Sequence, residues 1–282
     1  MFSVLLSIYY KENPRALEQC LDSILSQTRM PDEVVLVEDG DLPLELEKVV
    51  EKYKHKITNL KIISLATNVG LGKALNEGLK YCSYDIVARM DTDDIAKPER
   101  FEKQLAVFQE HPDIDVVGAW IDEFEDDISQ IRSARKLPES HEEIRQFAER
   151  RNPVNHPVVM FRKNAVLAAG EYQHFPLFED YYLWVRMLMT GAKFYNMQES
   201  LLYFRISPDM FKRRGGWKYA WNEARFQHCM LKMGFISWKR FCLNVLLRFP
   251  IRIAPNSVRS FIYEEFYKLK YCSTVVYMVP RA

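Results

Sequence analysis

Segments typical of strands and segments typical of helices alternate along the first 110 residues, and this alternation limits the possible folds more than any other feature. Four apolar runs are typical of buried strands: SVLLSIYY, DEVVLVEDG, LKIISLA and YDIVARMD. An amphipathic helical segment follows each run, first the one that Asn13 and Pro14 open, then segments within 43–56, 68–82 and 97–110. Alternation at this spacing predicts an α/β fold with a mostly parallel central sheet and flanking helices.

The pattern is less regular after residue 112. Strand character is found in IDVVGAWIDEFED, ISQIRSARKL and HPVVMFRK, and helical character in residues 140–150 and in EDYYLWVRMLMTG, which Gly191 closes. No flexible linker interrupts the chain, so we expect one domain that extends to about residue 210. We expect a helical extension over residues 211–282, where aromatic and basic residues dominate.

The net charge of +1 conceals a strong asymmetry along the chain. Residues 201–282 contain 15 Lys and Arg but only four Asp and Glu, so the rest of the chain is acidic. A basic tail suggests an anionic partner, either a nucleic acid or a lipid surface. Trp217, Trp221 and Trp238 lie among these basic residues, as in a helix at a membrane surface, although core packing explains such aromatic residues equally well.

Cysteine content and the apolar runs bear on the cellular compartment. The five cysteines are scattered and form no Cys-x-x-Cys pair, which argues against a zinc site or a disulfide framework and favours a reducing compartment. The first apolar run has no basic leader, so we expect a strand there and not a signal peptide. No run approaches the ~20 apolar residues of a transmembrane helix. We therefore expect a cytoplasmic protein.

Polar residues follow all four predicted parallel strands. They are Tyr9 and Glu12, Glu38 and Asp39, Asn68 and Lys73, and Asp91 and Asp93. Sheets of this kind bind ligands beyond the carboxyl ends of their strands. The sequence therefore predicts one polar binding crevice at this edge of the sheet.

The segment ARMDTDDI places Asp91, Asp93 and Asp94 directly after the fourth strand. One interpretation is that these acids cap a helix that begins near Pro98. The other is that they bind a divalent cation such as Mg²⁺ or Mn²⁺, which takes oxygen ligands. Capping accounts for one or two of the acids but not for Asp91, which favours the cation.

Three further features each have two interpretations. Gly70 and Gly72 either let the chain turn or, beside Lys73, open a phosphate-binding helix N-terminus. The pair Glu179 and Asp180 either stabilises a helix dipole or includes a general base whose pKa neighbouring aromatic residues raise. His156 precedes a proline, and a lone histidine is either structural or a weak metal ligand.

In this order along the chain, SVLLSIYYKENP, LDSILSQTRMPDEVVLVEDG, NVGLGKALNEGL, DTDD, HPVVMFRK and EDYYLWVRM resemble the family 2 glycosyltransferases with a GT-A fold. The resemblance extends over about residues 3–206. It implies a nucleotide-sugar-binding half at 1–112, an acceptor-binding half of the same domain at 113–210, and a basic helical tail at 211–282 that associates with membranes. The segment PDEVVLVEDG and the tail resemble sequences of the branch that builds bacterial O-antigen, capsule and exopolysaccharide units on a lipid carrier.

The resemblance also implies a role for each matching residue. The nucleotide-sugar site comprises Ser7, Tyr9, Glu12, Asp39, Asn68, Lys73 and Asp91. Asp93 is the main ligand of a Mn²⁺ or Mg²⁺ ion, with Asp91 and, more weakly, His156 as further candidates. Asp180 is the catalytic base, and Glu179 lies beside it near the acceptor. The chain departs from the family where Glu38 replaces an aspartate and where Tyr182 replaces a third acid, but neither change removes a residue that the mechanism needs.

The activity that the resemblance implies is an inverting transfer of a hexose, galactose or glucose, from a UDP-sugar. The acceptor is a hydroxyl of a saccharide on undecaprenyl diphosphate, and the enzyme is expected to lie on the inner face of the cell membrane with its tail on anionic lipids. A metal-dependent nucleotidyltransferase that acts on a sugar phosphate is an alternative, because it also uses a nucleotide-binding sheet and metal-binding carboxylates. A nucleic-acid-binding module leaves the acidic crevice unexplained, so we expect no nucleic-acid partner.

Overall fold

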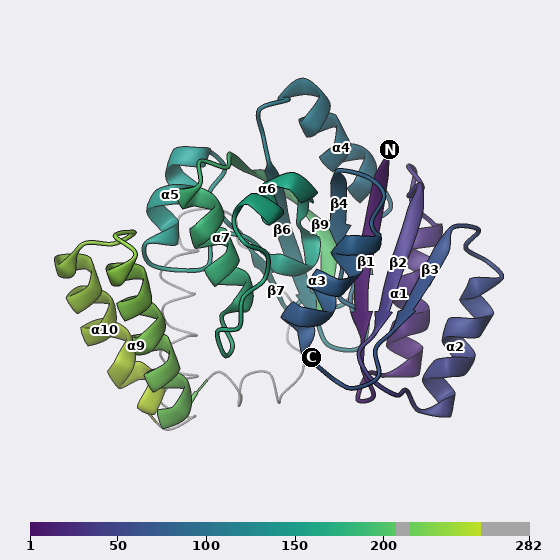
Figure 1. Ribbon diagram of the computed structural model, residues 1–282, viewed down its shortest axis with the longest axis horizontal. Helices are drawn as coiled ribbons and strands as arrows, with labels where there is room; N and C mark the ends of the chain where they lie inside the picture. Colours follow the sequence, from purple (N-terminus) through teal and green to yellow (C-terminus); the bar gives the residue numbers. More distant parts are fainter. Residues whose placement is uncertain (207–214, 255–282) are drawn as a thin grey trace, which may run out of the picture. The chain divides into compact units, whose positions relative to one another are not determined.

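The computed structural model describes residues 1–206 and 215–254 (Figure 1). The chain divides into two compact units, Met1–Ile206 and Ser207–Ala282. The first unit contains a nine-stranded sheet. Its strands are β1 (Phe2–Ile8), β2 (Glu33–Glu38), β3 (Leu60–Ser64), β4 (Ile86–Arg89), β5 (Ile95–Ala96), β6 (Val116–Phe124), β7 (Ser133–Arg135), β8 (Met160–Arg162) and β9 (Phe194–Arg205).

The strand order is β3-β2-β1-β4-β8-β6-β9-β5, and β7 pairs with β6. The first four strands are all parallel to one another, as the alternation of strands and helices predicts. Antiparallel pairing enters with β8, which lies between β4 and β6, while β6 and β9 run parallel. The parallel block brings the carboxyl ends of β1 to β4 to one edge of the sheet.

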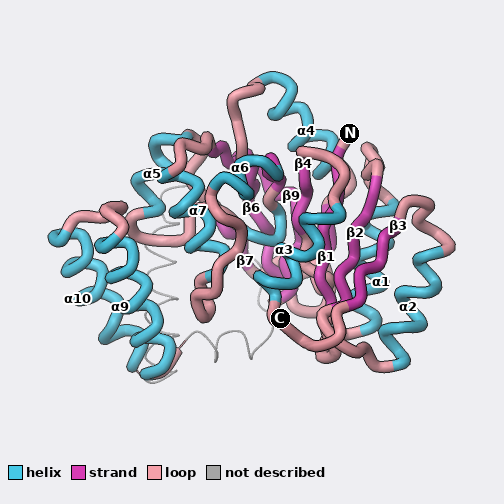
Figure 2. Tube along the Cα trace, viewed as in Figure 1, coloured by secondary structure: helices cyan, strands magenta, loops and turns pink. Residues whose placement is uncertain are grey.

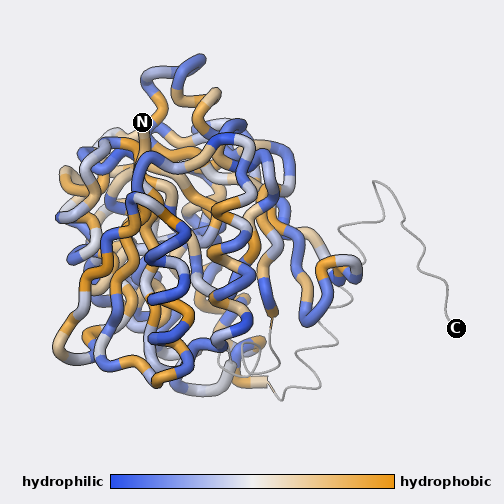
Figure 3. The backbone as a smooth tube through the Cα atoms, turned by 90° about the vertical axis from the view of Figure 1, so that its right-hand side faces the viewer, coloured by the Kyte–Doolittle hydropathy of each residue, from blue (hydrophilic) through white to orange (hydrophobic). Residues whose placement is uncertain are grey.

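Helices cover both sides of this sheet (Figure 2). They are α1 (Pro14–Leu25), α2 (Leu44–Lys54), α3 (Leu71–Tyr81), α4 (Arg100–Glu110), α5 (His141–Ala148), α6 (Lys163–Ala168) and α7 (Glu179–Met189), with a short 3-10 helix η1 at His156–Val158. Asn13 caps α1 as predicted, because its side chain accepts the backbone N–H groups of Arg15 and Ala16. Along the helices at the β3 edge, hydrophilic and hydrophobic residues alternate (Figure 3).

Both faces of β1 and β2 are buried, whereas the edge strand β3 is half-buried. Val4 and Leu6 of β1 belong to one core together with Leu17 of α1. Leu5, between them, faces α3, where a Cβ atom added to Gly78 would lie 2.4 Å from Leu5 Cδ1. The continuous apolar runs of the sequence reflect this burial on two sides.

The structure corrects parts of the sequence-based assignment. The segment HPVVMFRK is a strand only from Met160, because Pro157 lies in the first turn of η1 and the chain bends there. The short helix α6 follows this strand directly, and neither α6 nor the strands β5 and β9 were predicted. The capping interpretation of the acids after β4 is wrong, since α4 begins at Arg100 and its N-cap residue is Glu99.

The described part of the second unit is a helical hairpin, α9 (Trp217–Lys232) and α10 (Trp238–Ile253). This confirms the helical extension for residues 215–254, and the rest of the predicted tail lies outside the described residues. Glu223 of α9 joins the two helices, because its carboxylate accepts from Arg248 at 2.8 Å and from Arg252 at 2.8 Å. Within residues 1–206 and 215–254, no helix is long and apolar enough to cross a bilayer.

Candidate active site

Parallel pairing aligns the residues that follow β1, β2 and β4. Ser7 lies opposite Val37 of β2, and Leu5 lies opposite Arg89 of β4. Tyr9 and Glu12 follow in the turn after β1, where the Glu12 backbone N–H donates to the Tyr9 carbonyl oxygen at 3.1 Å. Ser7, Tyr9 and Glu12 are all half-buried. The structure thus brings them to the predicted edge, and their contact with a nucleoside stays a prediction.

Asp39 organises the turn between β3 and α3. Its carboxylate is buried and accepts the backbone N–H of Val69 at 2.6 Å and that of Gly70 at 3.0 Å. The Asn68 side-chain amide donates to the Asp39 carbonyl oxygen at 3.1 Å. Gly40 is required here, because its φ is +87° and a Cβ atom would lie 2.7 Å from the Asn68 backbone nitrogen. Two predicted donor-site residues, 29 positions apart, are therefore in contact.

Asp91, Asp93 and Asp94 form an acidic cluster. One carboxylate oxygen from each lies within 4.8 Å of the others. Burial, followed by the neighbouring Asp91, raises the pKa of Asp93 to about 6. Burial and the charges of Asp93 and Asp91 also raise the pKa of Asp94 well above its ordinary value. Three acids this close carry a negative charge that the protein only partly compensates.

The cluster fits a hard divalent cation. Asp94 is fully buried, and its Oδ2 atom has no hydrogen-bond partner within the described part of the chain. Carboxylate oxygens gathered in this way are the ligands that Mg²⁺ and Mn²⁺ take. His156 is not a member of this cluster.

Two arginines that sequence reasoning missed support the cluster. Arg89 is 1% exposed and forms an ion pair with Asp91. Arg205, at the end of β9, donates its backbone N–H to Asp94 Oδ1 at 2.8 Å and its Nε–H to the Asp93 carbonyl oxygen at 2.9 Å. A basic residue inside the apolar run DIVARMD was the available signal for Arg89. Nothing in the sequence pointed to Arg205, whose partners in the acidic cluster lie more than 100 positions away.

Glu179 of α7 lies beside the first turn of α3. A Cβ atom added to Gly72 would lie 3.6 Å from Glu179 Cγ and 3.4 Å from Tyr172 Cβ. Burial raises the pKa of the Glu179 carboxyl, which is half-buried and lies 3.7 Å from a ring nitrogen of His174. Glu179, the neighbour of the predicted base, thus lies close to the helix N-terminus that contains Gly72 and Lys73.

Asp180, the predicted base, has an amide partner. Its Oδ2 atom accepts from Asn152 Nδ2 at 2.6 Å. Asn152 belongs to the loop before η1, and sequence reasoning did not single it out. This contact joins the loop to the first turn of α7, so the two segments define the position of the carboxylate together.

His156 has a hydroxyl partner. Its Nε2 atom lies 2.8 Å from the Tyr172 hydroxyl group, and its ring packs near Trp184. Burial and the nearby charge of Arg89 lower the pKa of His156 well below its ordinary value, so the imidazole is neutral at neutral pH. Its role as a metal ligand stays a prediction.

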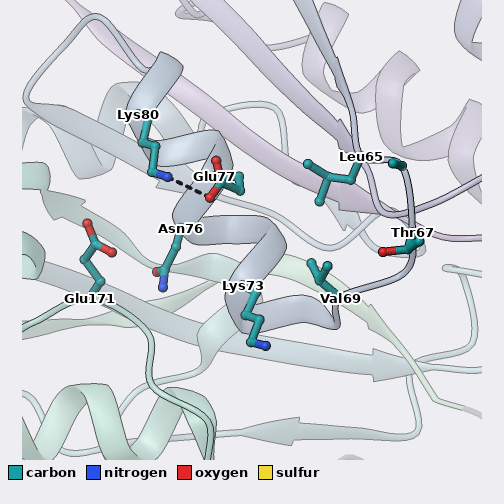
Figure 4. Close-up of a pocket in the computed structure, with 9 residues that line it drawn as sticks. Leu65, Thr67, Val69, Lys73, Asn76, Glu77, Lys80 and Glu171 are labelled. Carbon is teal, nitrogen blue, oxygen red and sulfur yellow. Dashed lines mark hydrogen bonds and ion pairs between the residues drawn. The ribbon is translucent and has the colours of Figure 1, made fainter.

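Lys73 lines a groove beside the predicted crevice, which we call the α3 groove (Figure 4). The groove has a volume of about 380 Å³ and lies between the loop before α3, one side of α3 and Glu171. Glu77 and Lys80 form an ion pair on its wall at 2.7 Å. The residues that line the groove do not include the acidic cluster, so the structure does not join Lys73 to the aspartates in one cavity.

Comparisons with known proteins agree with this architecture. The model of glycosyl transferase family 2 matches residues 3–168. The amylovoran biosynthesis glycosyltransferase AmsE of Erwinia amylovora is 42% identical over 94% of this chain and 98% of its own length. The UDP-Gal:alpha-D-GlcNAc-diphosphoundecaprenol beta-1,3-galactosyltransferase of Escherichia coli is 38% identical over 94% of this chain and 95% of its own length.

A solved structure supports the fold independently of close sequence similarity. The mannosyltransferase PcManGT from Pyrobaculum calidifontis, in complex with GDP-Man and Mn²⁺, superposes with a TM-score of 0.64 at 14% identity. The match covers 97% of this chain and 76% of that one. The fold is thus the GT-A fold, with a polar edge at the strand ends. The chain belongs to glycosyl transferase family 2, in its bacterial polysaccharide branch.

Proposed function

We propose that the chain is an inverting glycosyltransferase that moves a hexose, galactose or glucose, from a UDP-sugar to a saccharide on a polyprenyl diphosphate. The observation that carries this proposal is a juxtaposition across one edge of the sheet. The acidic cluster and the Asp39 turn lie at the strand ends, and Glu179, next to Asp180 on α7, lies against the first turn of α3. The galactosyltransferase at 38% identity supports both the donor and the type of acceptor.

In this proposal, residues 1–112 hold the donor and residues 113–210 hold the acceptor. The nucleoside binds among Ser7, Tyr9, Glu12, Asp39 and Asn68, and Asp91 lies near the ribose. Lys73 and the N-terminus of α3 contact the diphosphate, because backbone N–H groups and a lysine favour a phosphate there.

Asp93 and Asp91, with Asp94 beside them, are the residues that would hold the divalent cation. When bound, a Mn²⁺ or Mg²⁺ ion neutralises the charge that develops on the diphosphate of the departing UDP. The relative from Pyrobaculum calidifontis has a Mn²⁺ ion in its structure, which supports a cation of this kind.

Asp180 acts as the general base. It takes the proton of the acceptor hydroxyl as that oxygen forms a bond to the anomeric carbon, on the face opposite the bond to UDP that breaks. Glu179 lies next to it on the acceptor side. The transfer competes with hydrolysis, so the site has to exclude water while the sugar is bound.

The proposed location is the inner face of the cell membrane, because a polyprenyl-linked acceptor lies there. The exposed Trp217, Trp221 and Trp238 of the hairpin and its excess of basic residues support contact with anionic lipids.

The experiment is a screen of UDP-sugars with Mn²⁺ and a lipid-diphosphate N-acetylhexosamine acceptor. Wild type should release UDP and form a disaccharide, whereas Asp180→Asn should bind UDP without turnover and Asp93→Ala should lose metal-dependent turnover. Release of pyrophosphate from a nucleoside triphosphate would support the nucleotidyltransferase alternative instead. Full turnover by Asp180→Asn would remove the proposed base.

A further inference from the structure

Helix α10 carries an exposed apolar face. Leu246 is 72% exposed and Leu247 is 60% exposed, while Leu243 and Ile253 are 46% and 44% exposed. Spacings of three and four residues put these side chains and the exposed Pro250 on one side of the helix. We call Leu243, Leu246, Leu247, Pro250 and Ile253 the leucine face.

Three polar residues of α10 face inward, toward α9. Asn244 is 5% exposed and donates to Gln227 at 2.7 Å. Arg248 and Arg252 both reach the buried Glu223. A water-exposed helical hairpin normally buries its leucines and exposes its arginines, so the polarity of α10 is inverted from Leu243 to Ile253.

The charge of the hairpin indicates which kind of partner the leucine face contacts. Residues 215–254 contain seven Lys and Arg, and their single acid is Glu223, whose charge the two arginines already compensate. Exposed cations lie on both helices, at Lys218, Arg225, Lys232 and Lys239. An apolar helix face in so cationic a hairpin suits an anionic bilayer surface better than another protein core.

We propose that the leucine face inserts into the boundary between headgroups and acyl chains of an anionic membrane. This deepens the proposed function, on which it rests, by naming the surface that carries the membrane contact. The polar pairs between α9 and α10 hold the hairpin together while its leucines enter the lipid. Insertion of apolar side chains adds binding that salt does not screen, in contrast to the attraction between lysines and headgroups.

The test uses the full chain and vesicles of phosphatidylglycerol with phosphatidylethanolamine, followed by co-sedimentation. The affinity of the Leu246→Glu/Leu247→Glu variant for the vesicles should be lower than that of wild type by at least about tenfold. Wild-type binding should persist in part at high salt. The control is Leu167→Glu, because Leu167 is an exposed leucine of the first unit at 41%, and it should bind as wild type does. Circular dichroism and release of UDP with a soluble acceptor check that both variants fold.

Several outcomes would overturn the inference. One such outcome is that the double variant binds vesicles as tightly as wild type does. Another is that wild type does not bind the vesicles at all. Alternatively, light scattering shows a wild-type dimer that the double variant loses, in which case a second copy covers the leucine face. Asp180→Asn separates this test from the proposed function, since it should be inactive and still bind vesicles.

A second inference concerns the base. Asn152 donates to Asp180 at 2.6 Å, and its loop is anchored elsewhere, because the side chain of Asn155 donates to the Ala119 carbonyl oxygen of β6 at 2.9 Å. Pro153 between them adds stiffness. We infer that Asn152 is a positioning residue, which fixes the rotation of the Asp180 carboxylate and so presents it to the acceptor hydroxyl in one orientation.

Asn152→Leu tests this inference with an uncharged side chain of similar size that cannot donate and adds no second carboxylate beside Asp180. It should lower kcat on the order of tenfold to a hundredfold and leave KM for the UDP-sugar unchanged, and Asn152→Gln, which keeps a donor, should restore part of the loss. Gln173→Ala is the control, since Gln173 lies in the same acceptor segment and donates to the Gly170 carbonyl oxygen at 3.2 Å.

Wild-type kcat in Asn152→Leu would overturn the inference. An equal loss of affinity for the UDP-sugar would also overturn it, because such a loss indicates a general structural role. The inference rests on Asp180 as the base. If Asp180→Asn is inactive while Asn152→Leu is fully active, only the positioning role fails. If Asp180→Asn is active, the proposed function fails.

Discussion

Arg89 provides the sharpest test of how the acidic cluster is compensated. Its guanidinium is 1% exposed and pairs with Asp91, which is 31% exposed. Replacing Arg89 with Met keeps an unbranched apolar stem but leaves Asp91 beside Asp93 and Asp94 without that cation. Removing one partner of a fully buried pair costs about 3–5 kcal/mol. Because Asp91 is partly hydrated, we expect the free energy of unfolding to fall by about 2–3 kcal/mol.

The assay is thermal unfolding of the full chain in EDTA and in Mn²⁺. A loss of this size lowers Tm by roughly 5–10 °C in a domain of this length. The control is Arg29→Met, which removes an ion pair with Asp32 in which Arg29 is 41% exposed, and should cost less than about 1 kcal/mol. Mn²⁺ should stabilise Arg89→Met more than wild type, since a cation replaces the lost compensation. Equal Tm values for the two variants in EDTA would refute this reasoning.

Three further predictions concern the donor side of the sheet. The pKa of Asp93 is raised to about 6, above the ~3.9 of an unfolded aspartate, so the folded chain retains a proton that the unfolded chain loses. Stability measured by urea in EDTA should therefore fall as pH rises from about 4 to about 6, and less so in Asp93→Asn. Gly78→Ala should destabilise by about 1–3 kcal/mol in urea, because its Cβ would lie 2.4 Å from Leu5 and 2.7 Å from Val37. Asp39→Ala should lower the affinity for UDP, measured by calorimetry, on the order of tenfold, and unchanged affinity would separate Asp39 from the nucleoside site.

The parts of the fold that the sequence predicted are those with a strong local signal. Apolar runs bounded by turns identified β1 to β4, and Asn13 with Pro14 identified the start of α1. The missed elements have weak local signals. Strand β5 has two residues, and β9 contains the polar stretch NMQES, where the register with β6 shifts. Helix α6 follows β8 without a turn residue.

The residues of the candidate site also include some with a local sequence signal and others without one. Acids at strand ends could be found from the sequence, because the carboxyl ends of parallel strands meet at one edge. Contacts between distant segments could not be found in this way, because the spacing of residues in the sequence gives no signal for them. The pair Asn152 and Asp180 depends on how a loop meets α7, and Arg205 reaches Asp94 across 111 positions.

Internal compensation of the acidic cluster has a consequence for cation binding. Arg89 already pairs with Asp91, and the backbone of Arg205 already donates to Asp94. A cation therefore competes with groups of the protein for these carboxylates, and the cluster alone should bind Mn²⁺ weakly. Sites of this type complete their ligand set with substrate phosphates.

Mn²⁺ should thus bind more tightly when UDP is present, and by linkage UDP should bind more tightly with Mn²⁺ by the same factor. Electron paramagnetic resonance of free Mn²⁺ measures the first affinity and calorimetry the second. Arg89→Lys, which keeps the positive charge, is the matched variant for Arg89→Met. The affinity for Mn²⁺ without UDP should rise in Arg89→Met and change less in Arg89→Lys, because only the first removes the competing charge. Equal Mn²⁺ affinities with and without UDP in wild type would mean that the aspartates hold the cation unaided.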